Sequence, residues 1–489
     1  MSVRHLVHVV GLILVALSAA LGATTLVALY YGDGDFLAFL ASTLITAAAG
    51  LMAARRTSLA RELTVREGYA VVSLAWIATG VAGALPFLLA GATPSPVAAL
   101  FESMSGFTTT GASVFTDIEA LPHGILFWRN LTQWIGGMGI IVLGIAILPF
   151  LGVGGMQLFR AEVPGPTPER LQPRIAQTAK LLWYVYLGLT TLQVVLYLFG
   201  GLSVFDAVTH AFTTLSTGGF STRNASLAAF PPYAQYVTIL FMFLAGINFA
   251  LHYRAFTGHP VRYLRDPELR FFAGVLAGAT LLVLVVVWSA GAVGAPGPEV
   301  VFRHSLFQVV SIATTTGFVT FDYELWPVGG QLVLLLLMFM GGMAGSTSGG
   351  MKTIRVYVLV RHGLTEMKKS VHPRAVTVTR VGRQALRDDV VLNIFAFVLL
   401  YVGLFAAGSL VMALLGHDLV TAIGASAATI GNIGPGLGGV GAVDNYGWMG
   451  PVSQLALIFL MLVGRLEIFT VLLLFHPDLW RRYGAGSGD

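Results

Sequence analysis

The stretch Phe107-Thr108-Thr109-Thr110-Gly111-Ala112-Ser113 ends a short apolar segment with a run of hydroxyl residues and a glycine. Three later stretches repeat the pattern: 214–220 (TLSTGGF), 314–319 (TTTGFV) and 428–433 (ATIGNI). Their glycines Gly111, Gly218, Gly317 and Gly431 are separated by 107, 99 and 114 positions, and a hydroxyl residue stands two places before each: Thr109, Ser216, Thr315 and Thr429. One match would mean little because threonine and glycine are common at helix ends, but four matches predict a fourfold internal repeat.

Long apolar runs flank each of the four stretches. A bilayer core of about 30 Å requires roughly 20 apolar residues per helix, and by this measure the chain contains ten spans. They lie near residues 6–30, 36–54, 69–90, 125–151, 178–200, 233–251, 271–293, 330–359, 390–415 and 453–475. The first run is longer than the apolar region of a signal peptide and a second span follows at once, so we expect it to be retained.

The segment before each repeated stretch is too short to span the membrane. A helix of about 10–13 residues in this position is typical of a re-entrant segment. Ser95 with Pro96 is a candidate N-cap and first helical residue, and Ser203 and Asp418 are candidate caps of the second and fourth segments. The repeating unit is therefore a span, a half-helix, a glycine loop and a second span.

The composition is that of a membrane protein. Of the 489 residues, 56% are hydrophobic and 10% are charged, with a mean hydropathy of +0.80, whereas soluble domains carry about 25% charged residues. This balance excludes an ordinary globular enzyme, a disordered chain and a nucleic-acid-binding protein. The sequence contains no cysteine, which excludes disulfides, zinc-thiolate sites and thiol catalysis.

The basic residues predict the orientation. Of the 28 Lys and Arg residues, all but Arg129, Arg223, Arg303 and Arg465 fall near the chain ends or in alternate loops, the longest of which runs from Lys352 to Arg387. Cytoplasmic loops carry such an excess of positive charge. Both termini are therefore expected in the cytoplasm, as an even number of spans requires.

Four glycine loops around one pseudo-axis would line a single cavity, because irregular backbone is tolerated at membrane depth only where protein buries it or it lines a watery cavity. Glycine permits conformations that direct carbonyl groups inward, and rings of backbone carbonyls replace the hydration shell of the ion in potassium-channel filters. The half-helix C-termini would also favour a cation. The candidate filter residues are Thr109, Thr110, Gly111, Ser216, Thr217, Gly218, Thr315, Thr316, Gly317, Thr429, Ile430, Gly431 and Asn432.

The predicted fold is thus an all-α integral membrane protein with four pseudo-symmetric repeats of span, pore helix and span, like those of potassium channels, plus two N-terminal helices. The expected boundaries are 1–66 for the N-terminal pair and 67–160, 161–265, 266–365 and 366–489 for the four repeats. No ring of four carboxylates accompanies the loops, which argues against a divalent-cation filter.

With these motifs, and with GGMAGSTSGGMKTIR (341–355) and GRLEIFTVLLLF (464–475), the chain resembles the bacterial Trk-type potassium-uptake subunits (TrkH-like) over essentially its whole length. Their superfamily also contains the Ktr and HKT transporters, and the two extra N-terminal spans resemble the Trk branch more. In plant HKT relatives a serine at the first filter glycine goes with sodium preference, so Gly111 favours potassium. Ile430 departs from the hydroxyl-rich pattern, which makes the expected filter only pseudo-symmetric.

The resemblance implies a potassium-uptake protein of the bacterial cytoplasmic (inner) membrane, with potassium as the transported ion. It also implies a homodimer with one pore in each protomer, gated by a cytosolic nucleotide-binding TrkA-like subunit. No Walker A or Rossmann fingerprint stands in a strand–helix context in this chain, so nucleotide binding would belong to that partner. We expect no organic cofactor, no enzymatic activity and no nucleic-acid partner, and contact with membrane lipid.

The eighth span is interrupted by a glycine-rich stretch. Its candidate gate residues are Gly341, Gly342, Gly345, Ser346, Thr347, Ser348, Gly349 and Gly350. Each glycine costs a helix about 1 kcal/mol relative to alanine, so regular helix is not expected there. The stretch is either a packing kink or a flexible loop that obstructs the pore below the filter, and the resemblance implies the loop.

Arg465 is the one Lys or Arg predicted at the centre of a span. A central arginine costs a few kcal/mol on insertion scales, so it should face protein or water. It either forms a structural pair with Glu467 or Glu102, or projects into the pore below the filter, as the resemblance implies. A positive charge there would oppose cation passage.

Other polar residues near the loops allow two interpretations. Glu102, Asp206, His210 and Gln308 lie in the half-helices and either hydrogen-bond the filter backbone from behind or simply cap and pair. Asn248, inside the sixth span, is interpreted as a helix–helix hydrogen bond. The basic 361–387 loop would meet anionic lipid or a cytosolic partner.

Two other classes of function are alternatives to a potassium-uptake protein. An ion-coupled secondary transporter of a small solute also uses broken helices, but usually in inverted repeats, whereas the basic loops here have the same polarity in every unit. A membrane-embedded enzyme would need a cluster of His, Asp and Glu at membrane depth, and the sequence offers none.

Overall fold

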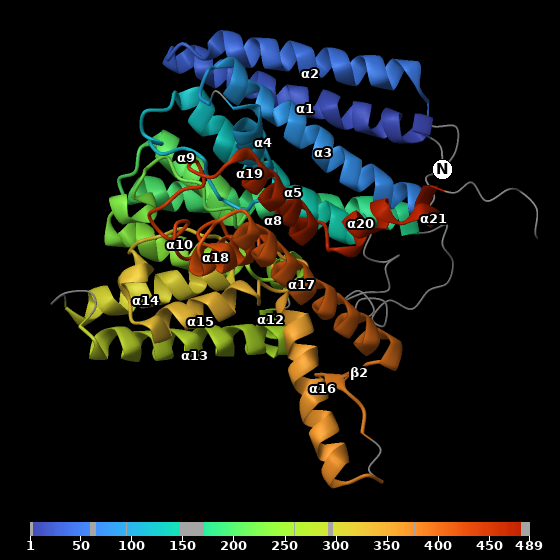
Figure 1. Ribbon diagram of the computed structural model, residues 1–489, viewed down its shortest axis with the longest axis vertical. Helices are drawn as coiled ribbons and strands as arrows, with labels where there is room; N and C mark the ends of the chain where they lie inside the picture. Colours follow the sequence, from blue (N-terminus) through green and yellow to red (C-terminus); the bar gives the residue numbers. More distant parts are fainter. Residues whose placement is uncertain are drawn as a thin grey trace, which may run out of the picture.

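The computed structural model describes residues 3–58, 65–93, 95–146, 171–258, 260–291, 297–374, 377–382 and 384–480. Within these ranges the regular secondary structure is helical, apart from the short antiparallel strands β1 (Arg380–Val381) and β2 (Gln384–Ala385) (Figure 1). Several features predicted from the sequence lie outside the described residues: the end of the fourth span (147–151) and the basic residues Arg61, Arg160, Arg170, Arg383, Arg481 and Arg482.

The first two helices form an antiparallel pair at one edge of the molecule (Figure 1). They are α1 (Val3–Tyr31) and α2 (Phe36–Arg56), and α1 also packs against α3 (Val65–Leu89) and α5 (His123–Ala146). Gly11 and Gly50 let the two helices approach closely, because a Cβ on either glycine would lie within 3 Å of the other helix's backbone.

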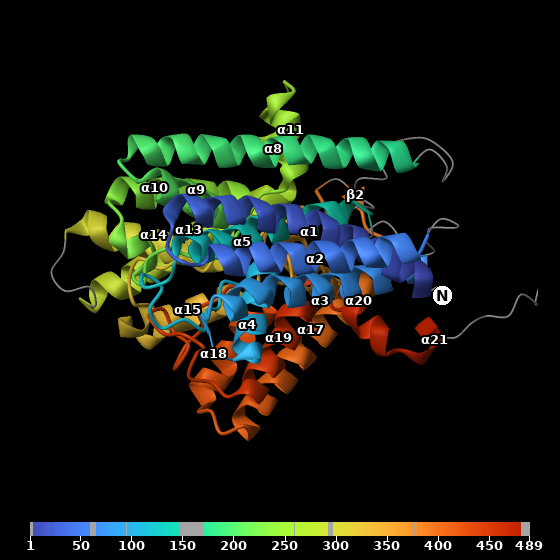
Figure 2. The ribbon, with the colours of Figure 1, turned by 90° about the horizontal axis from the view of Figure 1, so that it is seen from above.

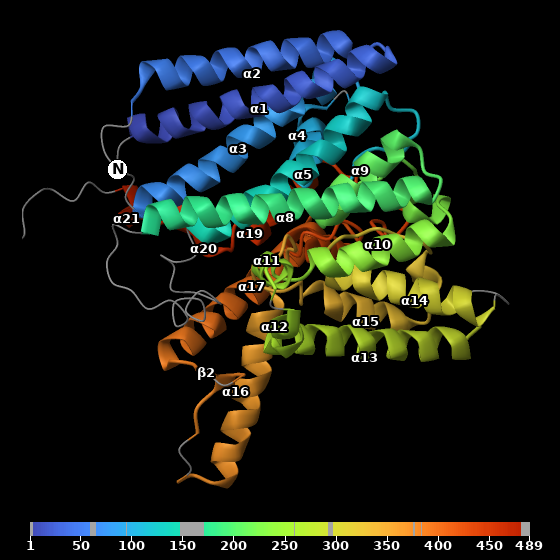
Figure 3. The ribbon, with the colours of Figure 1, turned by 180° about the vertical axis from the view of Figure 1, so that it is seen from behind.

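Four units of helix, half-helix and helix follow. The first contains α3, α4 (Pro96–Phe107) and α5; the second α8 (Leu171–Phe199), α9 (Val204–Leu215), α10 (Pro232–Ala245) and α11 (Phe249–Phe256); the third α13 (Pro267–Ser289), α14 (Pro298–Ala313), α15 (Val328–Met338) and α16 (Thr353–Val371); the fourth α17 (Asp388–Leu414), α18 (Leu419–Ile430), α19 (Pro451–Arg465) and α20 (Phe469–Leu472). Short helices complete the chain: α12 (Pro260–Arg265), α21 (Pro477–Trp480), η2 (Ser226–Ala229), η3 (Tyr323–Leu325) and η4 (Leu473–Phe475). Figure 3 shows the second and third units, green and yellow, side by side.

The half-helices α4, α9 and α18 are each 12 residues long and α14 has 16. The predicted caps are confirmed, because Ser95, Ser203 and Asp418 each accept a hydrogen bond from a backbone N–H in the first turn of the helix that follows. Their C-terminal halves are buried in the centre of the molecule, so each half-helix ends inside the protein.

Six helices in the described residues are long and apolar enough to cross a membrane, or up to eight if each bent pair counts as one span. The count of ten therefore stays a prediction. The interruption predicted in the eighth span is confirmed, since α15 ends at Met338 and α16 begins only at Thr353.

The predicted spans near 233–251 and 453–475 are each bent, which the hydropathy pattern did not indicate. α10 and α11 are bent by 99° and α19 and α20 by 116°. In the first case Asn248 accepts a hydrogen bond from the Ala250 N–H and starts a new helix. In the second, Glu467 and Ile468 both have positive φ, which no α-helix tolerates. With the interruption between α15 and α16, the second helix is therefore broken in three of the four units.

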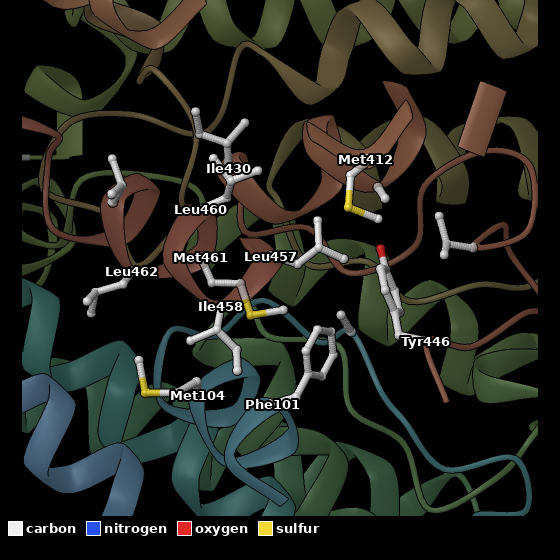
Figure 4. Close-up of a cluster of buried hydrophobic side chains, with 14 of the residues drawn as sticks. Phe101, Met104, Met412, Ile430, Tyr446, Leu457, Ile458, Leu460, Met461 and Leu462 are labelled. Carbon is white, nitrogen blue, oxygen red and sulfur yellow. The ribbon is translucent and has the colours of Figure 1, made fainter. Parts of the chain in front are cut away.

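The first and fourth units meet at the centre. Figure 4 shows Phe101 and Met104 of α4 facing Ile458 and Met461 of α19, far apart in the sequence, within one buried apolar cluster. All four side chains are at most 9% exposed. This contact joins the two ends of the repeat series, so the four units form a closed arrangement.

Candidate functional site

Each half-helix ends in the same backbone turn. The residue directly after each half-helix is its C-cap and has backbone angles in the right-handed helical region. These four residues are Thr108, Ser216, Thr314 and Gly431. The next residue is left-handed in every unit: Thr109 (φ 52°), Thr217 (φ 54°), Thr315 (φ 58°) and Asn432 (φ 53°). A left-handed non-glycine residue is uncommon, so its occurrence at the same place in all four units identifies these positions as structurally equivalent.

Two residues further on, each loop has a left-handed glycine: Gly111, Gly219, Gly317 and Gly434. A Cβ on Gly111 would lie 2.1 Å from the carbonyl oxygen of Gly218, and one on Gly219 would lie 2.0 Å from that of Thr316. A Cβ on Gly317 would lie 1.8 Å from the oxygen of Ile433, and one on Gly434 would lie 2.7 Å from that of Thr110. Each loop thus touches the next and the fourth touches the first, which places the four loops in a closed ring.

This geometry corrects the expected equivalence of the glycines in two of the four loops. The sequence pattern aligns Gly218 and Gly431 with Gly111, but in the structure they lie one and three residues before the left-handed glycines Gly219 and Gly434. Thr429 and Ile430 belong to the last turn of α18 and not to the loop. Sequence reasoning therefore missed Gly219, Ile433 and Gly434. The sequence did contain a signal for the correct alignment of Gly219 with Gly317, because phenylalanine follows both glycines.

The side chains of the four left-handed residues place oxygen atoms at the base of the ring. The Thr315 hydroxyl accepts a hydrogen bond from the Gly349 N–H (2.7 Å), and the Thr217 hydroxyl donates one to the Ser216 carbonyl (2.7 Å). Thr109 Oγ1 and Asn432 Oδ1 are buried, and in the described residues neither has a hydrogen-bond partner. A buried polar atom without a partner is costly, so both oxygens are available to a ligand.

The loop Gly341–Gly350 lies directly against this base. Thr347 donates from Oγ1 to the carbonyl of Leu215 at the end of α9 (2.9 Å), and a Cβ on Gly349 would lie 2.4 Å from the carbonyl of Gly431. The glycines at 341, 345 and 350 have positive φ, which explains why a helix cannot pass through. The loop is therefore held by the second, third and fourth units, at the place where their half-helices end.

The other side of the loop Gly341–Gly350 packs against the break between α10 and α11. The Met343 N–H donates to the carbonyl of Gly246 (2.8 Å), and the Phe249 N–H donates to the carbonyl of Gly345 (3.0 Å). A Cβ on Gly345 would lie 2.9 Å from the side chain of Asn248. Asn248 therefore caps α11 and packs on the loop, and the helix–helix hydrogen bond expected for it is not the contact that the structure shows.

Arg465, at the end of α19, is 2% exposed and donates to two backbone carbonyls. Its Nη1 lies 2.7 Å from the oxygen of Thr347 in the loop, and its Nη2 lies 3.3 Å from that of Gly136 in α5. Both carboxylates weighed as structural partners are bound elsewhere: Glu467 to Arg355, and Glu102 to Arg129. The guanidinium group therefore lies beside the loop, and no carboxylate of the described residues forms an ion pair with it.

A buried ion pair between the half-helix α4 and the helix α5 supports the ring. Glu102 of α4 and Arg129 of α5 lie 2.7 Å apart with fully buried side chains, and Glu102 also accepts from the Val114 N–H (2.9 Å). Arg129 donates to the Ser221 carbonyl of the second loop (3.2 Å) and lies over the Phe220 ring. The pair therefore connects the first loop to the second.

The other half-helix polar residues contact the segments that follow their own loops. His210 Nε2 lies 2.9 Å from Ser221 Oγ, Asp206 accepts from the Thr222 hydroxyl (2.6 Å), and Gln308 donates to the Phe321 carbonyl (3.1 Å). The two interpretations that the sequence left open each describe part of this set. Glu102 and Gln308 bond backbone groups that follow the loops, whereas Asp206 takes part in the cap of its own helix and pairs with Arg223. Asp206 also accepts from the hydroxyl of its helix cap, Ser203.

The known proteins most informative for this site are potassium transporters. A family model described as TrkH, cation transport protein, matches residues 35–482. The Trk system potassium uptake protein TrkH of Vibrio parahaemolyticus is 43% identical over 98% of this chain and 100% of its own length. The Trk system potassium uptake protein TrkG of Escherichia coli K12 is 34% identical over 98% of this chain and 99% of its own length.

The architecture agrees with a solved structure. The crystal structure of the potassium transporter TrkH from Vibrio parahaemolyticus superposes with a TM-score of 0.90 at 40% identity, covering 98% of this chain and 100% of that one. Together with the apolar helices, these relatives make the protein a membrane transport protein and not an enzyme. The chain belongs to the TrkH family of cation transport proteins.

Proposed function

We propose that this protein takes up potassium across the bacterial cytoplasmic membrane through a selectivity filter made of its four glycine loops. The observation that carries the proposal is the closed ring, in which a Cβ on each left-handed glycine would lie only 1.8–2.7 Å from a carbonyl oxygen of the next loop. The relatives named for potassium uptake match the chain over almost its entire length, which supports potassium as the ion.

The ring suits a partly dehydrated monovalent cation. In each loop two residues of positive φ flank one that lacks it, a backbone path that glycine makes accessible. Such loops can present a set of backbone carbonyls to the ion in place of water. Thr109 Oγ1 and Asn432 Oδ1 add oxygens at the base. The four half-helices end at this ring, and their partial negative charge favours a cation there.

The loop Gly341–Gly350 acts as the gate in this proposal. It lies against the base of the ring, and each contact that holds it is a hydrogen bond or a close approach of backbone that breaks without chemical change. The Arg465 guanidinium holds the Thr347 carbonyl and adds a positive charge that opposes cation passage. Opening then requires that the loop leave Thr315 and Leu215.

A cytosolic TrkA-like subunit and a homodimeric assembly complete the proposal. Helix α16 begins directly after the loop and carries the basic segment that the charge pattern assigns to the cytoplasm. A partner that moved α16 would pull on the loop through Thr353, whose hydroxyl donates to the Gly341 carbonyl (2.9 Å). The same charge rule predicts that both termini lie in the cytoplasm.

Uptake of rubidium into proteoliposomes that contain the purified protein tests the filter, with sodium as competitor and Gly111→Ser as the comparison variant. We expect selective uptake that the substitution relaxes, because a serine side chain at φ 81° would displace the carbonyl of Gly218. Equal uptake of both ions that the substitution leaves unchanged would place the selectivity site elsewhere. Including the cytosolic regulator in a parallel sample separates a closed gate from an inactive protein.

A further inference from the structure

A groove of about 410 Å³ lies in the angle between α8 and α11, on the outside of the second unit. Its walls include Tyr184, Gly188 and Leu192 of α8 and Tyr253 and Phe256 of α11. Figure 2 shows α11 crossing α8 and projecting beyond it. The groove is thus apolar, open to the side and bordered by the helix that follows the break after Ala245.

Both bordering helices are positively charged. The segments 171–199 and 249–265 contain five Lys and Arg residues and no Asp or Glu. Lys180 is exposed and lies one helical turn before Tyr184, on the same face of α8, so it extends the groove wall toward the N-terminal end of that helix. Arg254 lies on α11 between Tyr253 and Phe256, and α12 with Arg265 packs against α11.

The N-terminal end of α8 is the end that the charge pattern assigns to the cytoplasm. Basic pockets between transmembrane helices on that side bind anionic lipid headgroups, and the aromatic residues Trp183 and Tyr184, both exposed, are typical of the membrane interface. A lipid whose phosphate bound to Lys180 would place an acyl chain beside Gly188 and Leu192 in the groove. The charge and the shape therefore agree on one class of ligand.

We propose that this groove binds an anionic phospholipid of the cytoplasmic leaflet, with an acyl chain between α8 and α11 and its phosphate at Lys180 and Arg254. The first residue of α11, Phe249, donates its N–H to the Gly345 carbonyl of the loop below the filter (3.0 Å). The lipid therefore contacts an element that holds the loop. Its effect on ion flux rests on the proposed function, whereas its binding does not.

Gly188→Leu is the decisive variant. A Cβ on Gly188 meets nothing within 4 Å, so a leucine enters the groove without a clash, and leucine favours helix over glycine. Gly278→Leu in α13 is the matched control, because its Cβ also meets nothing within 4 Å and it lies on another outward face. Lys180→Gln tests the charge separately.

Native mass spectrometry of the full-length protein, taken from nanodiscs of phosphatidylglycerol and phosphatidylethanolamine, measures the lipid that stays bound. We expect phosphatidylglycerol to be retained by the wild type and by Gly278→Leu, and to be lost from Gly188→Leu. Lys180→Gln should retain about fivefold less, the effect of one basic residue near an anionic headgroup.

Three results would overturn the proposal. Equal retention by Gly188→Leu and the wild type would place the lipid elsewhere, and equal retention of phosphatidylethanolamine would remove the role of charge. Lipid-free wild type together with dissociation of dimers by Gly188→Leu would assign the groove to a second copy of the chain. Rubidium flux in the two lipids, measured on the same variants, then reports whether bound lipid influences the gate, independently of whether it binds.

Discussion

At the scale of single residues, neighbouring glycines in the same loop have different tasks. Gly219 is left-handed and approaches a backbone carbonyl of the third loop, whereas Gly218 is outside the left-handed region and faces the side chain of Gln133. A backbone atom in a closed ring has little room to move, whereas a side-chain end can shift at the cost of its own hydrogen bonds, here those of Gln133 with the Gly218 carbonyl and the Phe220 N–H. The two glycines therefore differ in how far they tolerate a methyl group.

Gly219→Ala should reduce rubidium uptake at least about tenfold relative to Gly218→Ala, because the left-handed conformation alone costs an L-residue about 1–2 kcal/mol. The added Cβ would also lie 2.0 Å from the Thr316 carbonyl oxygen. Uptake into proteoliposomes at matched protein content measures both variants. A larger loss in Gly218→Ala would mean that the repeats align as the sequence pattern first indicated.

The Glu102–Arg129 pair shows how the stability of one buried side chain depends on its partner. Arg129→Met should lower the free energy of unfolding by about 3–5 kcal/mol, because it leaves a buried carboxylate without its partner. The double variant Glu102→Leu/Arg129→Met should recover much of this loss. Denaturation of the purified protein in detergent measures both, and a double variant less stable than the single one would show that the charge of Glu102 is satisfied without Arg129.

At the scale of elements, the second helix of each unit is the part that differs. α5 continues as one helix to Ala146, while the corresponding helices of the other three units are broken where they pass below the ring. The breaks after Ala245 and Met338 meet, because the residues of one donate to carbonyls of the other. The interruption in the third unit therefore does not stand alone but fits into the bend of the second.

Thr347→Val should raise basal ion flux about fivefold, because it removes a hydrogen bond worth about 1 kcal/mol that holds the loop to the Leu215 carbonyl. Valine keeps the shape of threonine, so the loop itself should remain packed. Thr365→Val on α16 is the control, since its hydroxyl donates only within its own exposed turn. Equal flux in both variants, measured as rubidium efflux, would show that this contact does not keep the loop closed.

At the scale of the whole molecule, the N-terminal pair is tied to the first unit at the loop between α1 and α2. Asp33 in this loop accepts from the backbone N–H and the ring Nδ1 of His123, the first residue of α5, at 2.9 and 2.6 Å. In a similar contact between loops, Asn224 of the second unit donates to Asp117 of the first at 3.0 Å. These loop contacts join parts of the chain about 90 to 107 residues apart.

The hydrogen bonds from the His123 backbone and side chain hold the pKa of Asp33 below its ordinary value. A carboxyl group with a lowered pKa in the folded state contributes stability above its unfolded pKa, about 3.9, and loses it as the pH falls through the folded value. The wild type should therefore be more stable than Asp33→Asn near neutral pH, and the difference should shrink below about pH 4.

Thermal unfolding at a series of pH values measures this difference, with Glu366→Gln on the exposed side of α16 as the control. A gap between the wild type and Asp33→Asn that stays constant down to strongly acidic pH would mean that the Asp33 contact contributes nothing through its charge. A gap of the same form in Glu366→Gln would mean that the effect belongs to surface carboxylates in general.

The sequence by itself determined the class of protein, the half-helices with their caps at Ser95, Ser203 and Asp418, and the break at 341–350. These features depend on hydropathy, side-chain caps and glycine content within a few residues, so they can be predicted without knowledge of the rest of the chain. The number of loops and their order along the chain can be predicted from the sequence in the same way.

Only the tertiary structure decided which glycine of each loop faces its neighbour, where α10 and α19 bend, and which partners Glu102 and Glu467 take. Gly218 and Gly219 are equally permissive as isolated residues, and the carbonyl of Thr316, from the next repeat, selects between them. Arg129 and Arg355 are likewise distant in the sequence from the carboxylates they bind. Contacts between remote segments carry no local signal, which is why the register of the ring emerged only when the four units were brought together.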